Sequence, residues 1–188
     1  MAPAQTRSGQ GTGRPAEIRR LTPADWAVLR QARLAALADA PYAFSSTLER
    51  ELAFDEQLWR ERLAASAYFM AWQDGQPAGM AAGICERAAR AAGFQHAAAG
   101  TAHLVSMWVS PQARGRGVAD SLVEAVCGWA LAGGAARAEL WVTDVNARAR
   151  AFYRRMGFAS TGRRQLVRPD EPDHWEEQLA RQLAGPAC

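Results

Sequence analysis

The hydrophobic and polar positions of this chain predict strands and helices that alternate along most of its length. Short apolar runs, rich in β-branched and aromatic residues, predict strands at residues 17–21, 68–72, 78–85, 104–109, 140–143, 158–163 and 175–179. Apolar residues at helical spacing predict helices at residues 23–36, after Ser46, at residues 58–63, at residues 119–130 and up to Gly157. Asp74 and Gly75 predict a hairpin turn, and Ser46 and Glu49 have the spacing of a capping box.

This pattern predicts one domain over residues 16–184, which is long enough to bury a core of its own. Residues 1–15 are polar and rich in glycine and proline, so we expect a disordered tail. A short tail is expected at residues 185–188, and an alanine- and glycine-rich loop at residues 86–101.

Residues 104–120 contain the strongest candidate for a ligand site. The apolar first part predicts a buried strand that ends near Pro111, because proline cannot donate a hydrogen bond to a sheet. The sequence Arg-Gly-Arg-Gly follows at residues 114–117, and a helical pattern begins at once. Such a turn leaves free N–H groups at the positive end of a helix, where a phosphate can bind. An ordinary tight turn is the alternative interpretation.

Two common phosphate-binding motifs do not fit this turn. The Rossmann fingerprint requires a third glycine and an acidic residue about 20 residues later. The P-loop requires a lysine, and the chain contains none. The pattern that remains is Arg114-x-x-Gly117-x-Ala119.

A second motif follows the predicted strand at residues 140–143. It reads Asn146-x-x-Ala149-x-x-x-Tyr153-x-x-x-Gly157-Phe158. The two motifs, in this order and at this separation, resemble the signatures of the GNAT superfamily of N-acetyltransferases, and the resemblance covers most of residues 17–183. It implies a mixed, mostly antiparallel α/β sheet of six to seven strands flanked by about four helices. In that fold the two central strands splay apart.

The resemblance also implies a site for acetyl-CoA, without a metal. The residues expected to bind it, through main-chain groups in most cases, are Met107, Trp108, Val109, Arg114, Gly115, Arg116, Gly117, Val118, Ala119, Asp120 and Asn146. Arg114 either helps to hold the phosphates or is a solvated loop charge. Asn146 contacts the cofactor, serves as a helix N-cap, or does both.

Tyr153 stands where the superfamily places its general acid. A phenol stays protonated at neutral pH, so it can give a proton to the departing thiolate. The alternative is a core tyrosine on an apolar helix face. In some members a glutamate acts as the general base at the position where this chain has Trp141. Other members place the general base at the position of His103. Strand alternation predicts that His103 shares a face with Met107, and its imidazole suits deprotonation near pH 7. A surface histidine is the alternative, and Glu49, Glu51 and Asp55 are weaker candidates for the base.

Tyr42 and Phe44 lie in a predicted break between helices that, in the superfamily, forms a wall of the acceptor cleft. We expect them either to face the substrate or to anchor the loop in the core. The resemblance thus predicts transfer of an acetyl group from acetyl-CoA to a primary amine of a small molecule, by direct attack in a ternary complex. The alternatives are a protein or peptide N-terminal acetyltransferase and a non-catalytic acyl-CoA sensor on the same fold.

Composition and charge are consistent with an enzyme that binds an anionic cofactor. The net charge is +3, and the basic residues are scattered along the chain, which argues against nucleic acid as a partner. The chain contains no apolar run of about 20 residues and no signal-like start, so we expect no membrane association and no secretion. Cys85, Cys127 and Cys188 lack metal-ligand spacing and are odd in number, which predicts a reduced, cytoplasmic protein. Because dimers are common in the superfamily, a homodimer is also expected.

Overall fold

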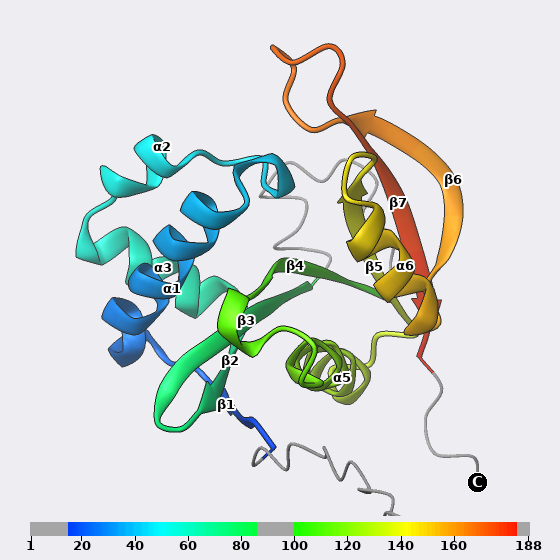
Figure 1. The fold of residues 1–188 in the computed structure, drawn as a ribbon. Coiled ribbons are helices and arrows are strands. Elements are labelled where there is room, and N and C mark those ends of the chain that lie inside the picture. Colours follow the sequence, from blue (N-terminus) through cyan, green and yellow to red (C-terminus); the bar gives the residue numbers. More distant parts are fainter. Residues whose placement is uncertain (1–14, 86–99, 184–188) are drawn as a thin grey trace, which may run out of the picture.

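A computed structural model describes residues 15–85 and 100–183. In this part of the chain seven strands form a single sheet in the order β1-β2-β3-β4-β5-β7-β6 (Figure 1). The strands are β1 (Glu17–Arg20), β2 (Ala67–Gln73), β3 (Gln76–Cys85), β4 (Thr101–Val109), β5 (Arg137–Thr143), β6 (Ala159–Leu166) and β7 (Trp175–Gln182). Neighbouring strands are antiparallel except for β4 and β5, which are parallel. The predicted mixed, mostly antiparallel α/β sheet is therefore confirmed.

Five α-helices cover this sheet in the described residues, where about four were expected. They are α1 (Trp26–Asp39), α2 (Leu48–Leu52), α3 (Glu56–Ala65), α5 (Val118–Ala132) and α6 (Ala147–Arg155). The predicted tail at residues 1–15 and the predicted loop at residues 86–101 fall almost wholly outside the described residues, as do residues 185–188. No described helix is long and apolar enough to cross a membrane.

Local sequence signals explain several boundaries of these elements. Asp74 and Gly75 both have positive φ, 51° and 76°, as a tight hairpin turn between β2 and β3 requires. The predicted capping box at Ser46 is wrong by one residue. Thr47 caps α2 instead, because its hydroxyl accepts a hydrogen bond from the backbone N–H of Arg50 at 3.2 Å.

The helices pack in two groups on opposite faces of the sheet. Figure 1 shows α1–α3 in blue and cyan at the left, and α5 and α6 in green and yellow. One hydrophobic cluster joins α5 and α6 to the sheet and includes Leu122, Tyr153 and Phe158. A second cluster joins α1–α3 to the sheet and includes Leu29 and Trp59. Each helical group therefore has its own core.

β4 and β5 separate soon after they meet. They pair over three residues only, from Thr101 opposite Arg137 to His103 opposite Glu139. On its other side β4 contains a bulge, because Ala82 pairs with Val105 and Met80 pairs with Trp108. Ser106 lies in this bulge and has φ of 55°, a conformation that is uncommon for residues other than glycine. The predicted splay between the central strands is confirmed, because residues 104–109 of β4 have no partner in β5.

Candidate active site

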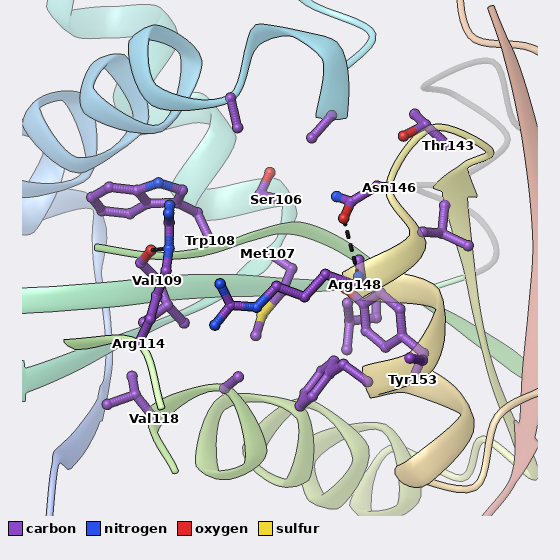
Figure 2. Close-up of a pocket in the computed structure, with 18 of the residues that line it drawn as sticks. Ser106, Met107, Trp108, Val109, Arg114, Val118, Thr143, Asn146, Arg148 and Tyr153 are labelled. Atoms are coloured by element: carbon purple, nitrogen blue, oxygen red, sulfur yellow. Dashed lines mark hydrogen bonds between the residues drawn. The ribbon is translucent and has the colours of Figure 1, made fainter. Parts of the chain in front are cut away.

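A cavity of about 700 Å³ lies where β4 and β5 separate. Its walls are residues 104–109 of β4, the turn that leads into α5, the helix α6, and the loop that follows α1. Figure 2 shows Tyr153 and Asn146 on the α6 side, with Trp108 and Arg114 on the opposite side. This volume is typical of sites for small molecules and cofactors.

The cavity brings together most of the site residues predicted from the sequence. Those that line it are Tyr42, Phe44, Met107, Trp108, Val109, Arg114, Gly115, Gly117, Val118, Ala119, Asp120, Asn146 and Tyr153. Arg116 and His103 are the predicted site residues that do not line it.

The glycine turn has a backbone conformation suited to an anion. Gly115 and Gly117 have φ of 79° and 78°, in the left-handed region that favours glycine. Gly117 is the N-cap residue of α5 and has no side chain to cap the first N–H groups. A Cβ added at either glycine would meet nothing within 4 Å, so there is open space beside the turn.

Asp120, in the first turn of α5, would by itself repel a phosphate. Its carboxylate is bound by Arg155 of α6, with Nη1–Oδ1 and Nη2–Oδ2 distances of 2.6 and 3.1 Å. The hydrogen bonds from Arg155 lower the pKa of Asp120. This ion pair links the two helices at the edge of the cavity and offsets the acidic charge there.

Arg114 has a role that neither of the two sequence interpretations contained. Its guanidinium donates to the carbonyl oxygen of Val109 at 3.1 Å and forms an ion pair with Asp39, the last residue of α1. The same carboxylate accepts a hydrogen bond from the indole of Trp108 at 2.9 Å. Asp39 therefore ties the end of α1 to β4 and to the start of the glycine turn. Sequence reasoning missed Asp39, because it belongs to no motif and its partners are 69 and 75 residues away.

Asn146 is the N-cap residue of α6. Its side-chain oxygen accepts a hydrogen bond from the backbone N–H of Ala149 at 3.0 Å, drawn as a dashed line in Figure 2. Capping occupies this oxygen and leaves the side-chain NH₂ group to donate elsewhere. The N-cap interpretation is confirmed, and the contact with a cofactor stays a prediction.

Tyr153 is part of the core and also lines the cavity. Its side chain is 6% exposed, and its ring packs against Phe152 and Phe158 with centroid distances of 5.1 and 5.8 Å. Burial raises the pKa of its hydroxyl, which therefore keeps its proton at any physiological pH. The two interpretations of Tyr153 are thus compatible, because the ring is anchored while the residue borders the cavity.

The structure corrects the expected position of His103. The bulge at Ser106 interrupts strand alternation, so Val105 packs on the α1–α3 side while Met107 packs on the α5–α6 side. His103 is 1% exposed, outside the cavity lining, with Nδ1 3.9 Å from Oε2 of the buried Glu139. Burial lowers the pKa of His103, and the Glu139 carboxylate opposes this effect. His103 is neither a surface residue nor in line with Met107.

We therefore expect His103→Gln to leave the acidic limb of the pH–rate profile unchanged and to lower thermal stability. The physical reason is that His103 packs among buried polar groups, outside the cavity. Steady-state kinetics between pH 5.5 and 9, together with thermal melts, test this expectation. A fall in kcat/KM of ~10²-fold with a flattened acidic limb would restore His103 as the general base.

The helical wall, which comprises α1–α3 and the loop after α1 and borders the cavity through Asp39 and that loop, holds the two predicted acceptor residues in different ways. Tyr42 is 46% exposed and lines the cavity, so its ring is available to a ligand. Phe44 is buried, and the guanidinium of Arg33 lies 4.5 Å from its ring centroid. Phe44 therefore anchors the loop in the core, and a contact between Tyr42 and the substrate stays a prediction.

Two of the weaker base candidates have structural roles in this wall. The carboxylate of Glu51 is fully buried between Arg33 and Arg62, with N–O distances of 2.9 Å to each. Asp55 caps α3, because its carboxylate accepts a hydrogen bond from the backbone N–H of Leu58 at 2.9 Å. Among the residues that the structure describes, no group of three or more His, Cys, Asp or Glu is placed to hold a metal ion.

The family model of the acetyltransferase (GNAT) family matches residues 32–158. This span begins inside α1, includes α2, α3, the glycine turn and the whole of α6, and ends at Phe158. The chain belongs to the GNAT family. No curated protein matches it significantly by sequence.

Solved structures of GNAT and related acetyltransferases share this fold. A ribosomal-protein-alanine N-acetyltransferase from Brucella melitensis has 20% identity and a TM-score of 0.66, over 89% of this chain and 99% of its own. The PaiA N-acetyltransferase from Thermoplasma acidophilum, in complex with coenzyme A, has 14% identity and a TM-score of 0.63. The match covers 89% of this chain and 98% of that protein. Nourseothricin acetyltransferase has 27% identity and a TM-score of 0.53, and the match covers 64% of this chain and 66% of that protein.

Proposed function

We propose that this GNAT protein transfers the acetyl group of acetyl-CoA to a primary amine of a small molecule, by direct attack in a ternary complex. One observation carries the proposal: the cavity at the separation of β4 and β5 has a glycine turn on one wall and Tyr42 on another. Both substrates can therefore enter one continuous space along β4. Acyltransfer is the reaction class of the family to which the chain belongs.

The residues present fit acetyl-CoA. The turn offers N–H groups at the positive end of α5 and open space beside Gly115 and Gly117. The family uses acetyl-CoA, and the neighbour from Thermoplasma acidophilum was solved with coenzyme A. We propose that the turn binds the pyrophosphate and that Asn146 donates its NH₂ group to the pantetheine arm. When bound, acetyl-CoA supplies an activated acetyl thioester.

The chain's own groups then position the reacting atoms and hold a proton. Main-chain N–H groups at Met107 to Val109 lie in the part of β4 that does not pair with β5. Those N–H groups that are not bonded to β3, with which Trp108 and Val109 pair, would donate hydrogen bonds to the thioester oxygen as negative charge develops there. Tyr153 holds a proton on its hydroxyl for the departing sulfur. We propose that the acceptor's proton leaves through water in the cavity.

Direct transfer is also supported by the state of the buried cysteine. Burial raises the pKa of Cys127 to about 11, so its thiol is not ionised at neutral pH and is a poor nucleophile. We propose that a small-molecule acceptor shares this cavity of about 700 Å³ with the cofactor and enters beside Tyr42. A cytoplasmic location and a homodimer stay predictions.

The test is a panel of amines assayed for release of free CoA from acetyl-CoA. We expect one class of small primary amine to accelerate release, with acetylation of that amine confirmed by mass spectrometry. Acetylation of peptide N-termini alone would identify a protein acetyltransferase, the activity for which the Brucella melitensis neighbour is named. Tight binding of acetyl-CoA with no acceptor in a broad panel would favour a sensor.

Gly117→Glu is expected to abolish acetyl-CoA binding. The new side chain would place bulk and a negative charge where the pyrophosphate is proposed to lie, and it would strain a residue with φ of 78°. Isothermal calorimetry with acetyl-CoA measures the effect. Gly162→Glu is the matched control, because Gly162 has the same φ and equal open space but lies in β6. Equal binding by the two variants would refute the phosphate-turn assignment.

A further inference from the structure

Among the residues that the structure describes, the charged side chains that line the cavity are paired, with one exception. They are Asp39, Arg114, Asp120, Arg148 and Arg155. Asp39 pairs with Arg114, and Asp120 pairs with Arg155. Arg148 is exposed and forms no ion pair with any residue that the structure describes. One positive charge therefore remains available to an anion.

Arg148 points into this cavity. Figure 2 shows its side chain extending from α6 across the open space toward the side formed by Met107, Val109 and Arg114. It points away from Thr143, which lies beyond Asn146 in the same view. The guanidinium is thus directed toward the part of the cavity that the glycine turn lines, and not toward the outer end of β5.

Helix stability does not explain why an arginine occupies this position. Arg148 follows the N-cap Asn146 by two residues, in a first turn that contains no acidic side chain. The positive end of a helix disfavours a cation there. Arg150, in the next turn, is compensated by Glu177 at 3.3 Å, whereas Arg148 has no comparable partner among the described residues. An anionic ligand would provide the missing compensation.

We propose that Arg148 binds a phosphate group of CoA from the α6 side of the cavity, opposite the N–H groups of the glycine turn. The inference rests on the proposed function, because it requires acetyl-CoA in this cavity. A guanidinium matches phosphate oxygens with two parallel hydrogen bonds and stays charged at any physiological pH. The cofactor is then held from two elements, the start of α5 and the start of α6. This gives the site a preference for phosphate-bearing ligands over pantetheine alone.

Calorimetry with CoA, 3′-dephospho-CoA and pantetheine tests the assignment on the full chain. Arg148→Ala should weaken CoA binding by roughly tenfold to a hundredfold, the value of charge-assisted hydrogen bonds that are lost. Arg148→Lys should recover part of the affinity. Pantetheine binding should be unchanged in both variants. If 3′-dephospho-CoA loses as much affinity as CoA, Arg148 contacts the pyrophosphate, and if it loses none, Arg148 contacts the 3′-phosphate.

Arg154→Ala is the matched control, because Arg154 is an exposed arginine on the same helix that does not line the cavity. Its CoA affinity should equal that of the wild type. Arg148→Ala should melt at the same or a higher temperature, since it removes a cation from the positive end of α6. A weaker salt dependence of CoA binding in Arg148→Ala alone would support the contact.

Three results would overturn the inference. Unchanged CoA affinity in Arg148→Ala excludes the phosphate contact while the proposed function stands. An equal loss for pantetheine assigns Arg148 to the shape of the site instead. Unchanged CoA affinity with a raised KM only for carboxylate-bearing amines assigns Arg148 to the acceptor. Failure of the wild type to bind CoA would be distinguishable from all three, because it removes the proposed function itself.

Discussion

Replacing Tyr153 with phenylalanine is expected to lower turnover by about 10²–10⁴-fold while acetyl-CoA affinity stays unchanged. The substitution removes one hydroxyl and keeps the ring that packs against Phe152 and Phe158. Burial raises the pKa of this hydroxyl, so the proton is present at every pH where the enzyme works. Its loss should appear in kcat, because we propose that the hydroxyl acts on the departing sulfur in the transition state. Steady-state kinetics and calorimetry on the same preparation separate the two quantities.

Tyr68→Phe is the control for this experiment. Tyr68 is another buried tyrosine, 5% exposed, and it does not line the cavity. Its hydroxyl lies 3.4 Å from the hydroxyl of Ser106, so the variant also measures what a lost hydroxyl near β4 costs in folding. Turnover should stay within the same order of magnitude. Equal activity of Tyr153→Phe and the wild type would remove Tyr153 from the mechanism and leave the enzyme assignment intact.

Glu51→Ala is expected to lower the free energy of unfolding by about 3–5 kcal/mol. The carboxylate is fully buried between two arginines, and the side chain of Arg33 is only 7% exposed. Without Glu51 the Arg33 charge remains buried without its partner. Chemical denaturation measures the change. Glu56→Ala, which removes an exposed carboxylate from its pair with Arg60, is the control and should change stability by no more than about 1 kcal/mol.

The same group predicts how stability depends on pH. Burial alone would raise the pKa of Glu51, but the hydrogen bonds from Arg33 and Arg62 outweigh it and hold the pKa at about 2. Between pH 4.5 and 2 the unfolded chain binds the proton more readily than the folded one. The stabilisation is therefore complete above pH 4.5 and is lost as the pH falls toward 2, and it amounts to about 3 kcal/mol. Acid unfolding of Glu51→Gln should lack this contribution. Identical acid transitions in Glu51→Gln and the wild type would show that the ion pairs do not stabilise the fold.

Local patterns allowed the elements and most of the residues that line the cavity to be predicted. The glycines at 115 and 117 adopt the positive φ that their position in a turn suggests, and Asn146 caps the helix that its spacing indicated. Such features depend on neighbours within a few residues, so they can be recognised in one sequence. Arg114 shows the limit of this reasoning, because its motif was recognised while its partner Asp39 was not.

The residues that could not be predicted depend on contacts between distant segments. The interrupted alternation in β4 arises from a bulge against β3, so His103 and Met107 do not share a face. The sequence makes Glu51 a weak candidate for the base, because it is a carboxylate near the expected acceptor side. Its burial between Arg33 and Arg62 follows from how α1, α2 and α3 pack. These two arginines are 18 and 11 residues away from Glu51 in the sequence. Arg148 differs from these residues. Its position at N2 follows from the N-cap at Asn146, and only the direction of its side chain into the cavity required the structure.

The two separate cores have an evolutionary consequence. Residues on the α5–α6 side of the cavity, such as Tyr153 and Val118, pack in the cluster under α5 and α6, whereas Phe44 and the helical wall pack in the other. Substitutions in clusters that share no partners tend to have additive effects on stability. Mutations that reshape the wall around Tyr42 can therefore accumulate without disturbing the glycine turn or α6. Asp39 links the two sides, because it joins the end of α1 to Arg114 and Trp108. A descendant of this chain could therefore change the loop around Tyr42 while it keeps the glycine turn and α6, provided that residue 39 is retained.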